Sequence, residues 1–162
     1  MRVEKSPEQA VSDLLREKSL TLAAAESCTG GLISKRMTDL GGASKVYCGG
    51  VVSYVNEVKH RVLGVSQETL ARFGAVSAET AKEMAAGVRR ICGSDIGVSV
   101  TGVAGPDRDD RGNAVGTVYV GVATNDQCYV TLLALDGDRE RIRSAAADRA
   151  LELVRETLLE LP

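Results

Sequence analysis

The feature that most constrains the fold is the succession of a short apolar run, a glycine-rich corner and a helical pattern. Residues 20–25 form such a run, Thr29-Gly30-Gly31 follows it, and apolar residues at helical spacing continue to Met37. Short apolar runs between turn signals are typical of strands that are buried on both faces, and helices then cover those faces. The pattern therefore predicts an α/β protein.

The rest of the chain extends this reading. We expect strands at residues 20–25, 46–55, 96–101, 117–123 and 128–135, and helices at 7–18, 29–37, 56–63, from 66, at 77–91 and at 138–159. A tight hairpin at 124–127 joins the last two strands and introduces antiparallel pairing. We predict one domain over residues 1–162, a three-layer α/β/α sandwich with a mixed, mostly parallel sheet of about five or six strands.

Composition agrees with this architecture and excludes several classes of function. The 162 residues are 44% hydrophobic but only 3% aromatic, so the core must consist mostly of Ala, Val, Leu and Ile. The net charge of −2 gives no field that would draw nucleic acid or an anionic membrane, although a phosphate-bearing small molecule stays possible. The chain shows neither a signal peptide nor an apolar run of about eighteen residues, so we expect a cytoplasmic protein with no membrane partner.

Cysteine and histidine usage argues against a metal site. The four cysteines, Cys28, Cys48, Cys92 and Cys128, are scattered without a C-x-x-C spacing. This arrangement argues against a zinc ribbon or a redox motif. His60 is the one histidine, so a Ser-His-Asp triad would have to use it, in a charged stretch with no obvious orienting partner.

Three corners are candidates for one functional site, at residues 26–31, 53–59 and 101–106. In open α/β sheets the ligand lies outside the carboxyl ends of the strands. If the strands that end near these corners are neighbours, the corners converge on one cleft. Neither G-x-G-x-x-G nor a P-loop pattern is present, so the sequence gives no support for a dinucleotide or P-loop site.

Ser27, at the first corner, has two interpretations. The backbone N–H groups at the start of the following helix could form an anion or oxyanion site. Alternatively, Ser27 or Thr29 caps the first helical turn and the glycines ease close packing, which composition alone favours.

Lys59 follows Tyr54 by five residues at the second corner. Taken singly, an exposed lysine beside Glu57 and a tyrosine on the sheet surface are the simpler interpretation. A serine hydroxyl, however, needs a base to become a nucleophile, and a partly desolvated lysine is the available candidate where histidine is scarce. The Tyr54 hydroxyl could then relay the proton or hold the lysine in place.

Further polar contacts could come from the third corner and from the last helix. The segment from Thr101 to Pro106 could donate hydrogen bonds to a substrate, or it could be a plain connection whose glycines permit positive φ. Arg139, Arg141 and Arg143 could clamp a phosphate, because guanidinium groups match its geometry. We expect at least one of the three to lie on a solvated helix face instead.

A set of segments has the order and spacing of one known family. These segments are Ala25-Glu26-Ser27-Cys28-Thr29-Gly30-Gly31, Gly50-Val51-Val52-Ser53-Tyr54 with Asn56 and Lys59, Gly74-Ala75-Val76-Ser77 with Glu79-Thr80-Ala81 and Glu83-Met84-Ala85, Thr101-Gly102-Val103-Ala104-Gly105-Pro106, Val115-Gly116-Thr117-Val118-Tyr119 and Gly137-Asp138-Arg139. Together they resemble the CinA C-terminal domain family, also called PncC, over about residues 8–160.

The resemblance implies a nicotinamide-nucleotide amidase, which converts nicotinamide mononucleotide and water into nicotinate mononucleotide and ammonia with neither a metal nor a cofactor. It implies that Ser27 attacks the carboxamide carbon, that Lys59 takes the serine proton, and that Tyr54 assists the relay to the leaving ammonia. The substrate-binding residues that it implies are Cys28, Thr29, Gly30, Gly31, Thr101, Gly102, Gly105, Arg139 and Arg141.

The resemblance is to the free-standing form of the family and favours a homo-oligomer, with a dimer first. The chain departs from the family at Asp107-Arg108-Asp109-Asp110-Arg111, where further glycines are usual, so this loop could change the preferred nucleotide.

Two other classes of function stay open. A catalytically silent nucleotide-binding or regulatory module would keep the same corners without a working base. An interaction protein of the competence or DNA-repair machinery would need a partner surface, and the acidic balance argues against direct DNA binding.

Overall fold

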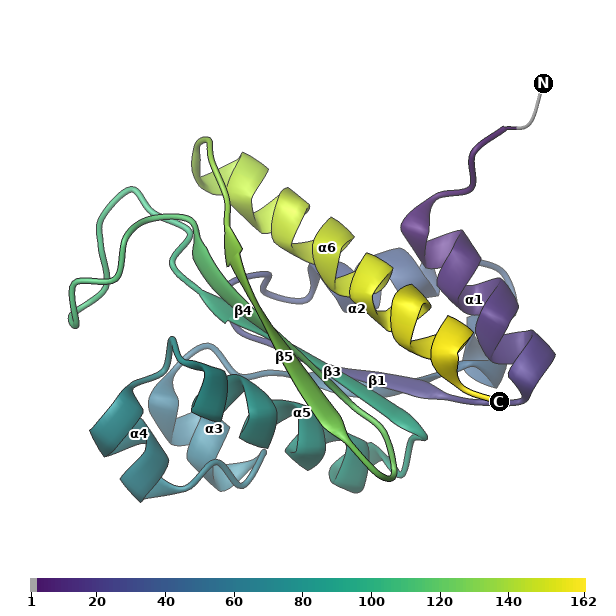
Figure 1. Ribbon diagram of the computed structural model, residues 1–162, viewed down its shortest axis with the longest axis horizontal. Helices are drawn as coiled ribbons and strands as arrows, with labels where there is room; N and C mark the ends of the chain where they lie inside the picture. Colours follow the sequence, from purple (N-terminus) through teal and green to yellow (C-terminus); the bar gives the residue numbers. More distant parts are fainter. Residues whose placement is uncertain (1–2) are drawn as a thin grey trace.

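The computed structural model describes residues 3–162, in which a five-stranded sheet lies between two layers of helices (Figure 1). The strands are β1 Leu22–Glu26, β2 Tyr47–Val52, β3 Ile96–Gly102, β4 Thr117–Ala123 and β5 Cys128–Ala134, in the spatial order β2-β1-β3-β4-β5. β1 pairs in parallel with both β2 and β3, whereas β4 is antiparallel to β3 and to β5. The predicted mixed, mostly parallel sheet is confirmed.

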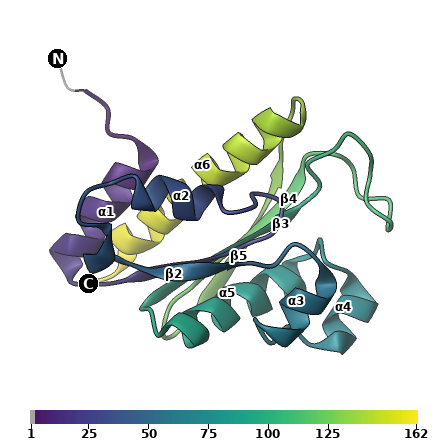
Figure 2. The same ribbon diagram turned by 180° about the vertical axis from the view of Figure 1, so that it is seen from behind.

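The helices are α1 Pro7–Lys18, α2 Leu32–Thr38, α3 Asn56–Arg61, α4 Gln67–Phe73, α5 Ala78–Cys92 and α6 Arg139–Glu160, with a short 3-10 turn η1 at Ala43–Lys45. α1, α2 and α6 cover one face of the sheet, and α5 covers the other with α3 and α4 beside it (Figures 1 and 2). This arrangement confirms the predicted three layers.

Alternation along the strands builds a separate core on each face. In β1, Leu22 and Ala24 pack into the core beneath α1, α2 and α6. Ala23 and Ala25 point the other way and pack with Met84 of α5. Successive side chains of a strand point to opposite faces, so a strand covered on both sides must be apolar throughout. The small side chains of β1 let both layers approach the sheet closely.

Helix starts follow the local capping signals. The Ser66 hydroxyl accepts a hydrogen bond from the Thr69 N–H at 3.0 Å, and the Ser77 hydroxyl accepts one from the Thr80 N–H at 3.1 Å. Each bond satisfies a backbone donor that has no partner within its own helix. The starts of α4 and α5 therefore lie where the sequence predicts them.

The second strand is shorter than predicted, because it ends at Val52 and not at residue 55. The Ser53 N–H still donates to the Glu26 carbonyl at 2.8 Å, after which β1 has ended and offers no further partner. The chain then turns into α3, where the Val55 carbonyl accepts from the Lys59 N–H at 3.2 Å. This early turn brings Lys59 back beneath the strand ends.

Candidate active site

The three predicted corners meet at the carboxyl ends of the parallel strands. The Ser27 N–H, just after β1, donates to the Val100 carbonyl of β3 at 2.9 Å, so the first and third corners lie side by side. A hollow of about 240 Å³ opens between the corners. It is lined by Ser27, Cys28, Tyr54, Lys59, Ala75, Val76, Thr101, Gly102, Ala104 and Arg139.

Lys59 is the buried charge of this hollow, with a side chain that is 1% exposed. Its Nζ lies 3.0 Å from the Ser27 Oγ, 2.7 Å from the Ser53 carbonyl oxygen and 3.3 Å from the Tyr54 carbonyl oxygen. Burial disfavours the charged form, and it lowers the pKa of Lys59 from 10.5 to about 8. A serine hydroxyl and an amine with a lowered pKa are thus in hydrogen-bond contact.

The contacts of Lys59 determine what the amine can do when it is neutral. A neutral amine has two N–H bonds and one lone pair. The carbonyl oxygens of Ser53 and Tyr54 can only accept, so they take the two N–H bonds. The lone pair is left for the Ser27 hydroxyl, which can donate its proton to it. The arrangement can therefore activate Ser27 as a nucleophile.

Glu26 holds the turn that follows Ser27. Its side chain is fully buried, and the carboxylate accepts from the Thr29 hydroxyl at 2.8 Å, the Ile33 N–H at 2.8 Å and the Ser34 N–H and hydroxyl at 3.0 and 2.8 Å. It therefore caps the start of α2, where a negative charge is favourable. Sequence reasoning missed this role. The signal was present, because an acidic residue ends an apolar strand directly before a helix start.

Arg143 holds the same turn from outside. Its Nε donates to the Cys28 carbonyl at 2.9 Å and its Nη2 to the Thr29 carbonyl at 3.2 Å. Within residues 3–162, the backbone N–H groups of Cys28 and Thr29 donate to no other residue. The turn therefore presents two backbone donors next to Ser27.

Arg139 spans the mouth of the hollow. One guanidinium nitrogen donates to the Gly105 carbonyl at 2.6 Å, and the other donates to the Tyr54 hydroxyl at 2.8 Å. The Tyr54 side chain is 57% exposed, so its phenol lies at the surface while its backbone carbonyl contacts Lys59. The Tyr54 hydroxyl accepts from Arg139 and keeps its own proton to donate, and the proton relay through it stays a prediction.

Other predicted substrate contacts lie elsewhere or are already engaged. Thr29, Gly30 and Gly31 line a neighbouring hollow of about 450 Å³ and not the Ser27 hollow, although the backbone N–H of Thr29, two residues after Ser27, donates to no other described residue. The Thr101 hydroxyl donates to the Ala75 carbonyl at 2.8 Å. Arg141 is exposed, and the lining of the Ser27 hollow does not include it. The roles given to these residues stay predictions.

The charged loop at residues 107–111 is folded against α4. The Arg111 guanidinium donates to the carbonyls of Leu70 and Arg72 at 3.3 Å each, near the end of α4. The Asp109 carboxylate accepts from the N–H groups of Arg111 at 3.2 Å and of Asn113 at 2.7 Å. Arg111 therefore ties the loop to α4, Asp109 ties the loop to itself, and neither side chain lines the Ser27 hollow.

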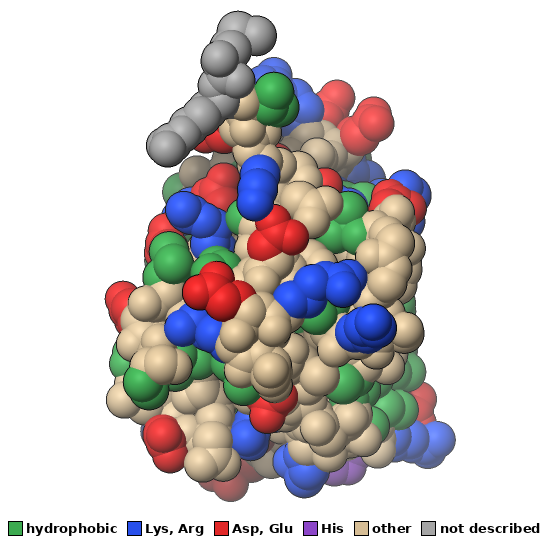
Figure 3. All heavy atoms as spheres, turned by 90° about the vertical axis from the view of Figure 1, so that its right-hand side faces the viewer, with side chains coloured by type: hydrophobic (Ala, Val, Ile, Leu, Met, Phe, Trp, Pro, Cys, Tyr) green, Lys and Arg blue, Asp and Glu red, His purple; other side chains and the backbone are tan. Residues whose placement is uncertain are grey.

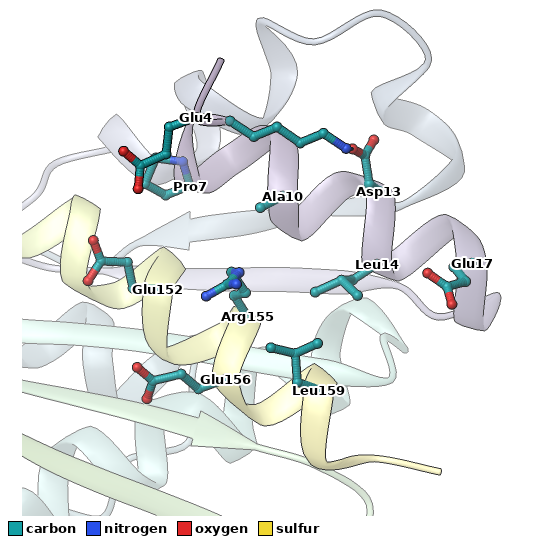
Figure 4. Close-up of a pocket in the computed structure, with 11 residues that line it drawn as sticks. Glu4, Pro7, Ala10, Asp13, Leu14, Glu17, Glu152, Arg155, Glu156 and Leu159 are labelled. Carbon is teal, nitrogen blue, oxygen red and sulfur yellow. The ribbon is translucent and has the colours of Figure 1, made fainter. Parts of the chain in front are cut away.

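A larger hollow, of about 720 Å³, lies between α1 and α6 (Figure 4). Leu14 of α1 and Leu159 of α6 face each other across it, and Glu152 and Glu156 line its α6 side. Its lining brings together no hydroxyl or thiol with a base, so we place the candidate site at Ser27 despite the smaller volume. Among residues 3–162, no group of three or more His, Cys, Asp or Glu side chains is arranged to hold a metal ion.

The surface shows no segregation of charge on the face drawn in Figure 3, where acidic and basic side chains are interspersed. None of the helices in the described part of the chain combines the length and the apolar character that crossing a membrane requires.

Comparisons with known proteins cover nearly the whole chain. The profile of the CinA C-terminal domain matches residues 4–158. A Thermoanaerobacter sp. (strain X514) protein, provisionally named competence-damage inducible, is 53% identical over 156 residues, which are 96% of this chain and 38% of that protein. A CinA-like protein from Geobacter sulfurreducens is 50% identical over 150 residues, 93% of this chain and 36% of that protein. The chain thus spans less than two fifths of the length of these curated relatives.

Solved structures give the same match. A competence-damaged protein (CinA) superfamily protein from Klebsiella pneumoniae has a TM-score of 0.93 and 30% identity, and the match covers 97% of this chain and all of that chain. A competence/damage inducible protein from Agrobacterium tumefaciens has a TM-score of 0.88 and 34% identity, with 99% and 100% covered.

Proposed function

Because this chain belongs to the CinA C-terminal domain family, we propose that it is a nicotinamide-nucleotide amidase, which hydrolyses the carboxamide of nicotinamide mononucleotide. The observation that carries the proposal is the buried Lys59 amine, 3.0 Å from the Ser27 hydroxyl. The geometry supports amide hydrolysis by a serine nucleophile, and the family resemblance supports the choice of nucleotide.

In the acylation step, the Ser27 Oγ attacks the carboxamide carbon while the neutral Lys59 amine takes the hydroxyl proton. The carbonyl oxygen becomes an oxyanion, which the free N–H groups of Cys28 and Thr29 are available to stabilise. The Lys59 ammonium then gives its proton to the amide nitrogen, the C–N bond breaks, and ammonia leaves. An ester between Ser27 and the nicotinoyl group remains.

In the deacylation step, Lys59 acts again as a base. It takes a proton from a water molecule, whose oxygen attacks the ester carbon. The C–O bond to Ser27 then breaks, the serine oxygen regains a proton from Lys59, and nicotinate mononucleotide leaves. One buried amine thus acts as base and then as acid in both half-reactions.

Arg139 is the residue that we propose for the phosphate of the nucleotide. It lines the hollow at its mouth, and its guanidinium is held by neutral acceptors, the Gly105 carbonyl and the Tyr54 hydroxyl. A phosphate competes well with such neutral acceptors, because its negative charge and its paired oxygens allow a bidentate ion pair with the guanidinium. This orientation leaves the carboxamide end of the substrate for Ser27.

Ammonia release from nicotinamide mononucleotide by the purified protein tests the proposal. We expect release by the wild type and none by Ser27→Ala or Lys59→Met, because each lacks one partner of the reacting pair. Ser44→Ala, at an exposed serine of η1, is the matched control and should retain full activity. Wild-type protein that binds the nucleotide without releasing ammonia would instead indicate a silent binding module.

A further inference from the structure

We propose that Arg143 is a positioning residue, which turns the backbone donors next to Ser27 toward the oxyanion of the reaction. The inference rests on the proposed function, because it assumes that Ser27 forms a tetrahedral adduct. Arg143 lies on the second turn of α6, and its guanidinium reaches the Cys28 and Thr29 carbonyls at 2.9 and 3.2 Å. Arg143 is more than one hundred residues away from both of them in the chain.

The direction of a peptide unit follows from its carbonyl. In a trans peptide the C=O and the N–H of the same unit point to opposite sides. Arg143 holds the Cys28 carbonyl toward α6, so the N–H of the same unit, which belongs to Thr29, points away from α6. The preceding unit is fixed likewise, because the Ser27 carbonyl accepts from the Gly30 N–H at 3.1 Å. Both carbonyls are therefore occupied, while the N–H groups of Cys28 and Thr29 stay free within residues 3–162.

Charge adds to orientation. The guanidinium is permanently positive, and it lies at the carbonyl end of the peptide unit whose N–H would meet the oxyanion. A preorganised donor stabilises a developing negative charge without rearranging during the reaction. Arg143 and the Glu26 carboxylate both fix the turn, since Glu26 accepts a hydrogen bond from the Thr29 hydroxyl at 2.8 Å. The turn is thus fixed before substrate binds.

Arg143 packs closely against Gly30. The φ of Gly30 is +60°, and a Cβ at this position would lie 2.9 Å from the Arg143 Nη2. A larger residue would therefore push the guanidinium away from the turn. Arg139 lines the Ser27 hollow and Arg143 does not, so Arg143 is poorly placed to meet the phosphate of a nucleotide bound there. This separates its role from that of Arg139.

The test measures how fast Ser27 reacts with a fluorophosphonate, followed by intact mass. The Ser27 Oγ–P bond forms and the P–F bond breaks, with fluoride and the hydroxyl proton as leaving groups, so the reaction passes through a charged phosphoryl centre beside the same donors. We expect Arg143→Ala to lower the labelling rate by about 10- to 100-fold. The loss of a whole oxyanion donor costs about 100- to 1000-fold, and a misplaced donor should cost no more than that. The pH midpoint of labelling should stay at the wild-type value, because Lys59 keeps all its contacts.

Matched variants separate positioning from folding. Arg155→Ala removes an exposed arginine from the same helix and should label at the wild-type rate. Arg143→Lys keeps the charge but cannot reach two carbonyls at once, so its rate should be intermediate. Added guanidinium ion should restore part of the rate to Arg143→Ala and not change Arg155→Ala. If Arg143→Ala does not fold, Arg143→Lys decides the matter alone.

Three results would overturn the proposal. The first is labelling of Arg143→Ala at the wild-type rate, or of Arg143→Lys if the alanine variant does not fold. The second is a shifted pH midpoint of labelling in either variant, and the third is no labelling of the wild type. The amidase assay tests the proposed substrate independently of the role of Arg143. Wild type that labels readily, slows on loss of Arg143 and releases no ammonia from nicotinamide mononucleotide would refute the proposed substrate and leave the role of Arg143 standing.

Discussion

The buried amine of Lys59 gives a quantitative prediction for the stability of Lys59→Met. The side chain is 1% exposed, and burial lowers its pKa from 10.5 to about 8. In the unfolded chain the amine is hydrated and keeps its ordinary pKa. Between pH 8 and 10.5 the unfolded chain therefore binds more protons than the folded chain, so the stability of the wild type rises with pH across this interval.

The size of the effect follows from the lowered pKa. At about 1.4 kcal/mol per pH unit, lowering the pKa from 10.5 to about 8 destabilises the folded wild type by about 3 kcal/mol while the amine is protonated in both states. Methionine has a similar length and binds no proton. The difference in free energy of unfolding between wild type and variant should therefore change by about 2.5 kcal/mol in favour of the wild type from pH 7 to pH 10.

Urea unfolding at pH 7, 8, 9 and 10, followed by circular dichroism, measures this difference. The change with pH is the informative quantity, because methionine also leaves the Ser53 and Tyr54 carbonyls without a donor at every pH. Lys45→Met, at an exposed lysine, is the control, and its difference from the wild type should not vary with pH. A difference for Lys59→Met that stays constant over the four pH values would refute the lowered pKa.

Three further predictions concern Lys59, Glu26 and the packing of α5. If Lys59 is the base, kcat/KM for ammonia release should rise about tenfold per pH unit below pH 8 and level off above it, and a profile that falls across this range would contradict the assignment. Glu26→Gln replaces an acceptor that holds four hydrogen bonds by an amide with one acceptor oxygen, so it should lower the free energy of unfolding by about 2–4 kcal/mol, measured by urea unfolding. Gly87→Ala should lower it by about 1–3 kcal/mol despite the higher helix propensity of alanine, because the new Cβ would lie 2.0 Å from the Leu63 carbonyl oxygen, whereas Gly41→Ala meets nothing within 4 Å and should be neutral.

The elements of the fold could be predicted because they depend on local patterns. The apolar run before Ser27, the serine caps of α4 and α5 and the hairpin before β5 each follow from a few adjacent residues. The predicted end of β2 was wrong by three residues, because the end of this strand depends on where the neighbouring strand β1 stops. A pattern within one strand carries no information about the length of its partner.

The Ser27–Lys59 pair of the candidate site could be named from the sequence, but not all the contacts around it. The scarcity of histidine points to Lys59 as the base for Ser27, and the structure brings these two side chains into contact. Arg143 was one of three arginines near a helix start, and sequence spacing cannot say which of them reaches a turn 115 residues away. Its partners are backbone carbonyls, which every residue has, so the side chains of the turn leave no signal of the contact.

The helix α6 covers the core and also carries Arg139 and Arg143 on its first turns. Protein synthesis runs from the N-terminus, so Ser27, Tyr54 and Lys59 leave the ribosome well before this helix does. A nascent chain that has been synthesised to the end of β3 still lacks Arg139 and Arg143. Ser27 therefore gains its complete surroundings only when α6 docks, and during refolding the proposed amidase activity should appear only after α6 has docked.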